Sequence, residues 1–152
     1  MREKNTVYLI KRANLNFDKI ANHTLASYGI THSQFKCLKY LYLFDNGSLN
    51  QRDLEHYFHM SNPTVTRILQ NLEKEGWIKR LANGKDKRHK QLYLTDKALS
   101  MQENFKDIAN QLESQLTERL TDQELDHLQT LLRKMLALSL IHISEPTRLG
   151  MI

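Results

Sequence analysis

The sequence predicts a mainly α-helical protein with one two-stranded β-hairpin, and three observations support this fold class. Apolar residues recur at helical spacing along most of the 152 residues. Residues 77–94 instead alternate apolar and polar positions on both sides of a turn, which is typical of a hairpin. Residues 79–90 hold six Lys or Arg and one Asp, a net of +5 that equals the formal charge of the whole chain. Such focused positive charge favours a polyanionic partner.

The N-terminal part contains two predicted helices. Apolar residues at helical spacing predict a first helix over about residues 4–27, which Gly29 ends. Thr31 and Gln34 form a capping-box pattern, in which each side chain bonds to the backbone N–H of the other, so a second helix begins there. We expect the second helix to bury Phe35, Leu38, Leu41 and Tyr42.

The next two helices form an expected helix-turn-helix. A turn at Asp45-Asn46-Gly47 precedes a short helix over about residues 50–59. This short helix is expected to bury Leu54, Tyr57 and Phe58. Ser61 is the expected N-cap of the fourth helix, and Pro63 lies in its first turn, where a missing N–H has no cost. The core-facing positions of this helix are Val65, Ile68, Leu69 and Leu72.

The hairpin and two longer helices complete the predicted elements. The strands of the hairpin are residues 77–81 and 91–94, with Asn83-Gly84 in the turn. Thr95 is expected to cap one long helix, and a second capping-box pattern at Thr121 begins the last helix. Six helices around one basic hairpin predict a mainly α fold with a winged helix-turn-helix in its middle.

The C-terminal segment 139–152 departs from this pattern. It breaks the apolar periodicity of the helix before it, and its string SLIHISEPTRL resembles the translation of a sequencing adaptor read through the end of a gene fragment. We expect a non-native tail that takes no part in the fold. The alternative interpretation is a genuine disordered tail.

Composition and motifs exclude several classes of protein. No apolar run approaches the roughly 20 residues of a membrane span, and the polar N-terminus is unlike a signal peptide. A single cysteine, Cys37, excludes an internal disulfide and favours the reducing cytoplasm. The glycines are isolated, so no phosphate-cradling loop exists, and no hydrolase motif is present. We expect a cytoplasmic protein that is not an enzyme, does not bind a membrane, and needs no cofactor or metal.

The fourth predicted helix presents a polar face that suits the major groove of DNA. Its short hydroxyl, amide and cationic side chains can pair with base edges, and the N-terminal half of such a helix usually enters the groove. The expected recognition residues are Asn62, Pro63, Thr64, Thr66, Arg67 and Gln70. The alternative, an ordinary solvated helix face, is less favoured because a basic hairpin follows directly.

Two further groups are expected to contact the DNA backbone or the minor groove. The first lies in the hairpin and consists of Lys85, Lys87, Arg88 and Lys90. Asp86 lies among these cations, and we interpret it as a brace that pairs with an Arg to hold the shape of the wing. The second group, Asn50, Gln51 and Arg52, begins the third helix, where exposed N–H groups favour phosphate.

The block DKRHKQLYLTDKA, residues 86–98, resembles the wing signature of the MarR family of bacterial winged-helix regulators. That signature is Asp-x-Arg, a strand, then Leu-Thr and a Gly. The matching positions are Asp86, Arg88, Leu94 and Thr95. Ala98 replaces the Gly, a mild departure because alanine suits the start of a helix. Residues 61–80 resemble the recognition helix of the family and its first wing strand, and residues 121–136 resemble its last dimerisation helix.

This resemblance implies a homodimer that reads an inverted-repeat operator on double-stranded DNA. Residues 1–138 would form one MarR-type domain, with the DNA-binding lobe over about residues 31–94. The dimerisation helices would be residues 4–27 and 95–138. Members of the family usually repress genes, and many release DNA when a small aromatic ligand, an oxidant or a metal binds.

Two alternatives stay open at this stage. One is a winged helix that binds protein and has no operator, although such domains tend to lose the cationic wing. The other is a redox- or metal-sensing variant of the same regulator. Cys37 would be the redox candidate, but a packed small hydrophobe is the favoured interpretation. His56 and His59 could hold a metal, yet the sequence offers no clear third ligand.

Overall fold

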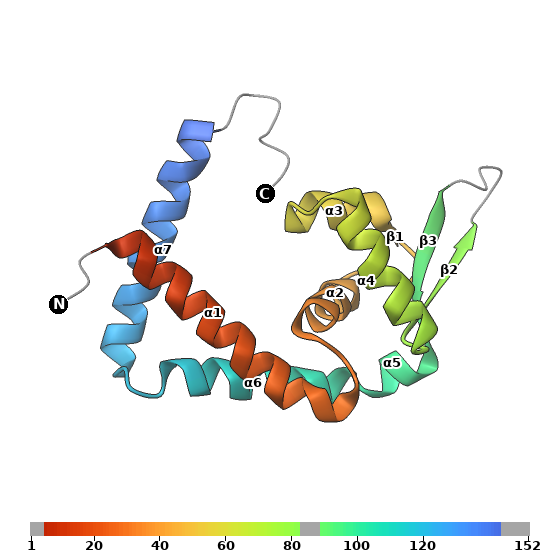
Figure 1. Cartoon of the computed structure of the whole chain (residues 1–152), viewed down its shortest axis with the longest axis horizontal. Helices are drawn as coiled ribbons and strands as arrows, with labels where there is room; N and C mark the ends of the chain where they lie inside the picture. Colours follow the sequence, from red (N-terminus) through yellow and green to blue (C-terminus); the bar gives the residue numbers. More distant parts are fainter. Residues whose placement is uncertain (1–4, 83–88, 144–152) are drawn as a thin grey trace. The chain divides into compact units, whose positions relative to one another are not determined.

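The computed structural model describes residues 5–82 and 89–143 and is mainly helical (Figure 1). The chain divides into two compact units, residues 1–112 and 113–152. The elements of the first unit are α1 (Thr6–Leu25), the 3-10 helix η1 (Ala26–Tyr28), α2 (His32–Tyr42), β1 (Leu49–Asn50), α3 (Gln51–Phe58), α4 (Asn62–Lys74), β2 (Ile78–Ala82), β3 (Lys90–Leu94), α5 (Asp96–Ser100) and most of α6 (Gln102–Thr117). The second unit holds the end of α6 and α7 (Asp122–Ile143).

The sheet of the lobe is antiparallel, with the strand order β1-β3-β2 within the described residues. β2 and β3 form the wing, and their register pairs Ile78 with Leu94 and Arg80 with Leu92. The short strand β1 adds to the other side of β3, where Leu49 faces Leu92. The predicted fold class is therefore confirmed, and the sheet contains one strand more than the expected hairpin.

Local capping determines where these helices begin. The expected capping box of α2 is present: the Gln34 backbone N–H donates to Thr31 Oγ1, and the Thr31 N–H donates to Gln34 Oε1. Ser61 caps α4, with Pro63 in the first turn, as expected. α3 opens with a box that was not predicted, in which the N–H of Asn50 donates to Asp53 Oδ2 over 2.9 Å.

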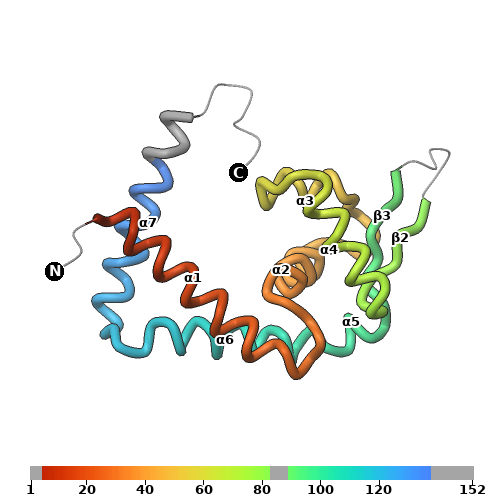
Figure 2. Tube along the Cα trace, in the orientation of Figure 1, coloured from red at the N-terminus to blue at the C-terminus, as the bar shows by residue number. Residues whose placement is uncertain are grey.

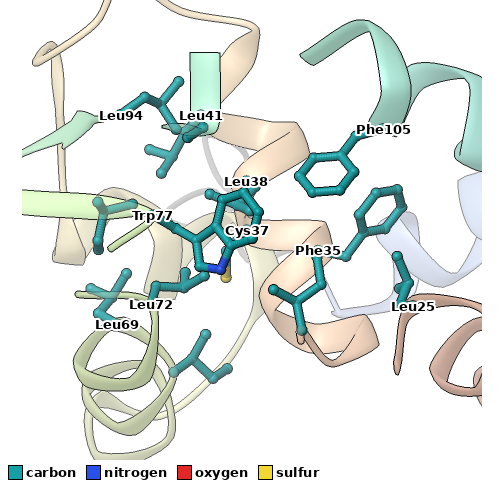
Figure 3. Close-up of a cluster of buried hydrophobic side chains, with 14 of the residues drawn as sticks. Leu25, Phe35, Cys37, Leu38, Leu41, Leu69, Leu72, Trp77, Leu94 and Phe105 are labelled. Carbon is teal, nitrogen blue, oxygen red and sulfur yellow. The ribbon is translucent and has the colours of Figure 1, made fainter. Parts of the chain in front are cut away.

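One aromatic cluster lies in the core of the lobe (Figure 3). The ring of Phe105 on α6 lies 5.4 Å from that of Phe35 and 5.5 Å from that of Trp77, measured between centroids. The partly exposed ring of Tyr28 lies 5.9 Å from it. The predicted inner faces of α2 and α4 belong to the same core, although Tyr42 on α2, like Phe58 on α3, is only half-buried. The prediction that Tyr57 is buried is wrong, because its side chain is 48% exposed and stacks on Tyr40.

The C-terminal helices differ from the expectation in two places. The single helix expected after Thr95 is divided, because α5 ends at Ser100 and α6 begins at Gln102 (Figure 2). At the break, the Met101 N–H donates to the Ala98 carbonyl, a tightened last turn. α7 opens with the expected capping box at Thr121, and it continues to Ile143, into the segment expected to lie outside the fold.

His32 connects α2 to α1. Its Nδ1 lies 2.6 Å from Asp18 Oδ1, and its backbone N–H donates to Asn22 Oδ1. The edge of the imidazole meets the Phe17 ring, with 5.2 Å between centroids. Burial lowers the pKa of His32 below 6.5 and outweighs the hydrogen bond to Asp18, which raises it.

We expect the free energy of unfolding to fall as the pH drops below 6.5, the ordinary pKa of His32. Between that value and the lower folded-state pKa, the unfolded chain binds more protons, so stability present at higher pH is lost on acidification. Urea unfolding at about pH 7.5 and about pH 5.5 measures the effect, which should be larger in the wild type than in His32→Gln. If the wild type instead gains stability over the variant at the lower pH, pairing with Asp18 outweighs burial.

Candidate nucleic-acid interface

A groove of about 400 Å³ lies where α3, α4 and the wing strands meet. Its lining is mostly polar and consists of Asn50, Gln51, Arg52, Glu55, Asn62, Thr66, Arg80, His89, Lys90 and Leu92. The structure thus brings together residues from three predicted groups: the start of α3, the recognition helix and the wing. The concave, polar shape is suited to hydrogen-bonding groups at the edge of a duplex.

The predicted recognition residues lie on the outer side of α4. The four apolar residues of the opposite side are buried, as the helical spacing predicted. Asn62, Pro63, Arg67 and Gln70 are exposed, whereas Thr64 and Thr66 are half-buried. Amide, hydroxyl and guanidinium groups of this kind can read base edges in a major groove.

The N-terminus of α3 is only partly available to phosphate. Its capping box uses the backbone N–H groups of Asn50 and Asp53. The N–H groups of Gln51 and Arg52 are also first-turn donors that a helix cannot satisfy internally. Gln51 and Arg52 are therefore better candidates than Asn50 for contacting a DNA phosphate through their backbone N–H groups.

A carboxylate that was not among the predicted site residues lies inside the groove. Glu55 Oε2 accepts hydrogen bonds from Gln51 Nε2 over 3.0 Å and from Asn62 Nδ2 over 2.9 Å. Gln51 Nε2 also donates to Thr66 Oγ1 over 2.8 Å. These bonds join the two helices of the helix-turn-helix. The signal in the sequence was the spacing of Gln51 and Glu55, since residues four apart share a helix face.

Arg80 connects the wing to the recognition helix. Its Nη2 donates to Glu73 Oε1 over 2.9 Å, so β2 is tied to the side of α4. The hydrogen bond from Arg80 holds the pKa of the Glu73 carboxyl below its ordinary value. Arg80 Nε is buried and has no hydrogen-bond partner within the described residues. Arg80 is thus a structural contact and part of the groove lining at once.

Most of the predicted wing cations lie outside the described residues. This applies to Lys85, Lys87 and Arg88 and to the predicted brace Asp86. Lys90 is described, exposed, and part of the groove lining. His89 next to it also lines the groove.

None of the sensing candidates is among the residues that line this groove. Cys37 is 1% exposed, and burial raises the pKa of its thiol to about 11, so the unreactive thiol form dominates at neutral pH. His59 is the C-cap of α3, and His56 is exposed in the last turn of that helix. No group of three or more potential metal ligands occurs among residues 5–82 and 89–143. In the same residues, no helix has the length and hydropathy to cross a membrane.

Comparison with known proteins decides the family. The MarR family model matches residues 30–90. The multiple antibiotic resistance protein MarR of Salmonella typhimurium is 33% identical over 129 residues, which cover 84% of this chain and 88% of that protein. The chain belongs to the MarR family.

Solved MarR-family structures agree with this assignment over most of the chain. The S. aureus MepR–DNA complex matches with a TM-score of 0.80 and 30% identity, covering 89% of this chain and 98% of that one. A mutant MarR from E. coli, complexed with operator DNA, matches with a TM-score of 0.76 and 30% identity, covering 85% and 91% of the two chains. The chain is accordingly a MarR-family transcriptional regulator, and its relatives are regulators rather than enzymes.

Proposed function

We propose that this protein is a homodimeric, sequence-specific DNA-binding regulator that represses at an inverted-repeat operator and responds to a ligand. One observation carries the proposal: the groove collects polar residues of α3, α4 and β3 beside the exposed N-terminal half of α4. The structures of MepR with DNA and of MarR with operator DNA support a DNA partner.

Base reading and backbone contact would come from different residues. The N-terminal half of α4 would enter the major groove and read bases through Asn62, Pro63, Thr64, Thr66, Arg67 and Gln70. The start of α3 and Lys90 would contact phosphates, which sets affinity and register. The sequence alone assigns the same phosphate-contacting role to Lys85, Lys87 and Arg88, with Asp86 as their brace.

Exposed apolar residues support the homodimer. On α1 they include Val7, Leu9, Ile10 and Leu15. On α7 they include Leu128, Leu131, Met135 and Leu136. Large exposed apolar residues along a helix mark interaction surfaces, and a second copy would cover them. Two recognition helices held about 34–36 Å apart would meet successive major grooves. Residues 1–138 would then act as one MarR-type domain.

The ligand response rests on the family resemblance. A small aromatic effector that binds one arrangement of the two lobes better than another would shift the population toward it without touching DNA. The redox variant of this response is less favoured, because Cys37 is buried and its thiol pKa is raised.

Selection of the purified protein against a random duplex DNA pool tests the function. Enrichment of an inverted repeat, with half-sites about one helical turn apart, is the expected result. A folded protein that enriches no sequence would instead support the winged helix that binds protein.

Lys90→Ala is expected to weaken binding to all DNA and to flatten its salt dependence. Each lost phosphate contact should reduce the slope of log K against log salt by about 0.9. Lys90 is exposed in the groove, whereas Lys106 is exposed on α6 and not part of the groove lining. Lys106→Ala is the matched control, and titrations at several salt concentrations give both slopes. Equal salt slopes for the two variants would mean that Lys90 does not contact DNA.

A further inference from the structure

We propose that Glu55 is a specificity-determining residue, because it fixes which edge the Asn62 amide presents to DNA. The inference rests on the operator reading proposed above. It starts from an unexpected feature of the groove: a carboxylate lies in a surface that otherwise suits a polyanion.

Both amides are held by the same carboxylate oxygen. Glu55 Oε2 accepts from Gln51 Nε2 within α3 and from Asn62 Nδ2 across the turn to α4. The Gln51 amide nitrogen also donates to Thr66 Oγ1 and, over 3.4 Å, to the backbone carbonyl of Asn62, so its orientation does not depend on Glu55 alone. The hydroxyl of Thr66 in turn donates to Asn62 Oδ1 over 3.5 Å, so all four side chains form one connected network.

The charge of Glu55 decides the orientation of the Asn62 amide. An ionised carboxylate has only acceptor sites, so a bonded amide must turn its NH₂ group toward the carboxylate. The Asn62 carbonyl oxygen then points away from Glu55. A neutral partner such as glutamine can donate as well as accept, so the same amide could rotate by half a turn and reverse its polarity.

The pinned orientation has a consequence for base reading. With its NH₂ held by Glu55 and one lone pair of Oδ1 facing the Thr66 hydroxyl, Asn62 offers the other lone pair of Oδ1, an acceptor, to a base edge. The major-groove edges of adenine and cytosine each carry an amino donor, whereas those of guanine and thymine carry carbonyl acceptors at the corresponding position. The charge of Glu55 acts in the same direction, since it repels carbonyl acceptors. We therefore expect adenine or cytosine at the position that faces Asn62, and discrimination against guanine and thymine.

The test is a comparison of selected sequences from random duplex pools. Wild type, Glu55→Gln, Asn62→Ala and the double variant are selected in parallel. Glu103→Gln is the matched control, because it removes the same charge from an exposed residue of α6 that does not line the groove. At one position in each half-site, the preference for adenine or cytosine should fall by about fivefold or more in Glu55→Gln. Glu103→Gln should keep the wild-type motif.

The double variant separates positioning from bulk charge. If Glu55 acts through Asn62, Asn62→Ala loses the same preference, and adding Glu55→Gln changes that position no further. An inverted repeat with an identical base at every position in wild type and Glu55→Gln would overturn the inference and leave the proposed function intact. An equal rise in the affinity of Glu55→Gln for all sequences would also overturn it, because the carboxylate would then act only as a charge.

The remaining outcomes are also decisive. A wild type that enriches no repeat would overturn the proposed function and this inference with it. If Glu55→Gln does not fold, as judged by its thermal unfolding, Glu55→Ala takes its place beside Asn62→Ala, because it also removes the carboxylate that accepts from Asn62. Asn62→Ala with an unchanged motif would then overturn the inference.

Discussion

Replacing Phe105 by alanine is expected to lower the free energy of unfolding by about 3–5 kcal/mol. Phe105 is 1% exposed, and its ring contacts those of Phe35, Tyr28 and Trp77. The substitution removes a large apolar surface from the core, and the surrounding helices can fill the resulting cavity only in part. Loss of edge-to-face ring pairs adds to the cost of the cavity.

The matched control is Phe44→Ala, which removes the same side chain from an exposed site. Phe44 is 44% exposed and makes one edge contact with Tyr40. Its removal should cost about 1 kcal/mol or less. Chemical denaturation of both variants measures the difference. Equal losses would mean that Phe105 is not the centre of a tightly packed core.

Arg67→Ala is expected to weaken binding to the selected operator by about 1–3 kcal/mol per half-site and to relax the base preference at one position. Arg67 is exposed in the middle of α4, on the side away from the buried strip that holds the helix in place. A guanidinium there can pair bidentately with guanine, a contact that only the correct base satisfies. Random DNA should be affected less, because most random sequences lack the correct base at that position.

Lys74→Ala provides the control for charge. Lys74 is exposed in the last turn of the same helix, so its loss changes net charge equally without touching the N-terminal half. Competition binding with operator and random duplexes gives both affinities for each variant. If the two substitutions weaken operator and random DNA to the same extent, Arg67 contributes charge and reads no base.

Features that depend on neighbouring residues could be predicted from the sequence. The cap at Ser61 and the apolar spacing of Val65 and Ile68 act within two turns of helix, so the start and inner face of α4 were predicted correctly. The same holds for the capping boxes at Thr31 and Thr121. The fold class follows from such local signals, because their order along the chain is specific.

Features that depend on residues far apart in the chain could not be predicted from the sequence. β1 is two residues long and exists because it pairs with β3, more than forty positions later, so no alternation marks it. Tyr57 satisfied the helical spacing of a buried residue, yet it stacks on Tyr40 near the surface. The role of Glu55 depends on Asn62 in another helix, and the spacing of acids along one helix does not reveal such a bond. The division at Met101 was hidden because apolar spacing continues through it.

The position of Trp77 gives this protein an internal optical reporter. It is the single tryptophan of the chain, and it is buried against Phe105 with the Lys97 amine 4.1 Å from its ring centroid. Its emission therefore originates from one place, the junction of the wing with α5 and α6. Melting of the C-terminal unit alone would leave the emission of Trp77 unshifted, whereas opening of the lobe would move it to longer wavelength. A fluorescence trace beside a circular dichroism trace would thus separate the two events without any added label.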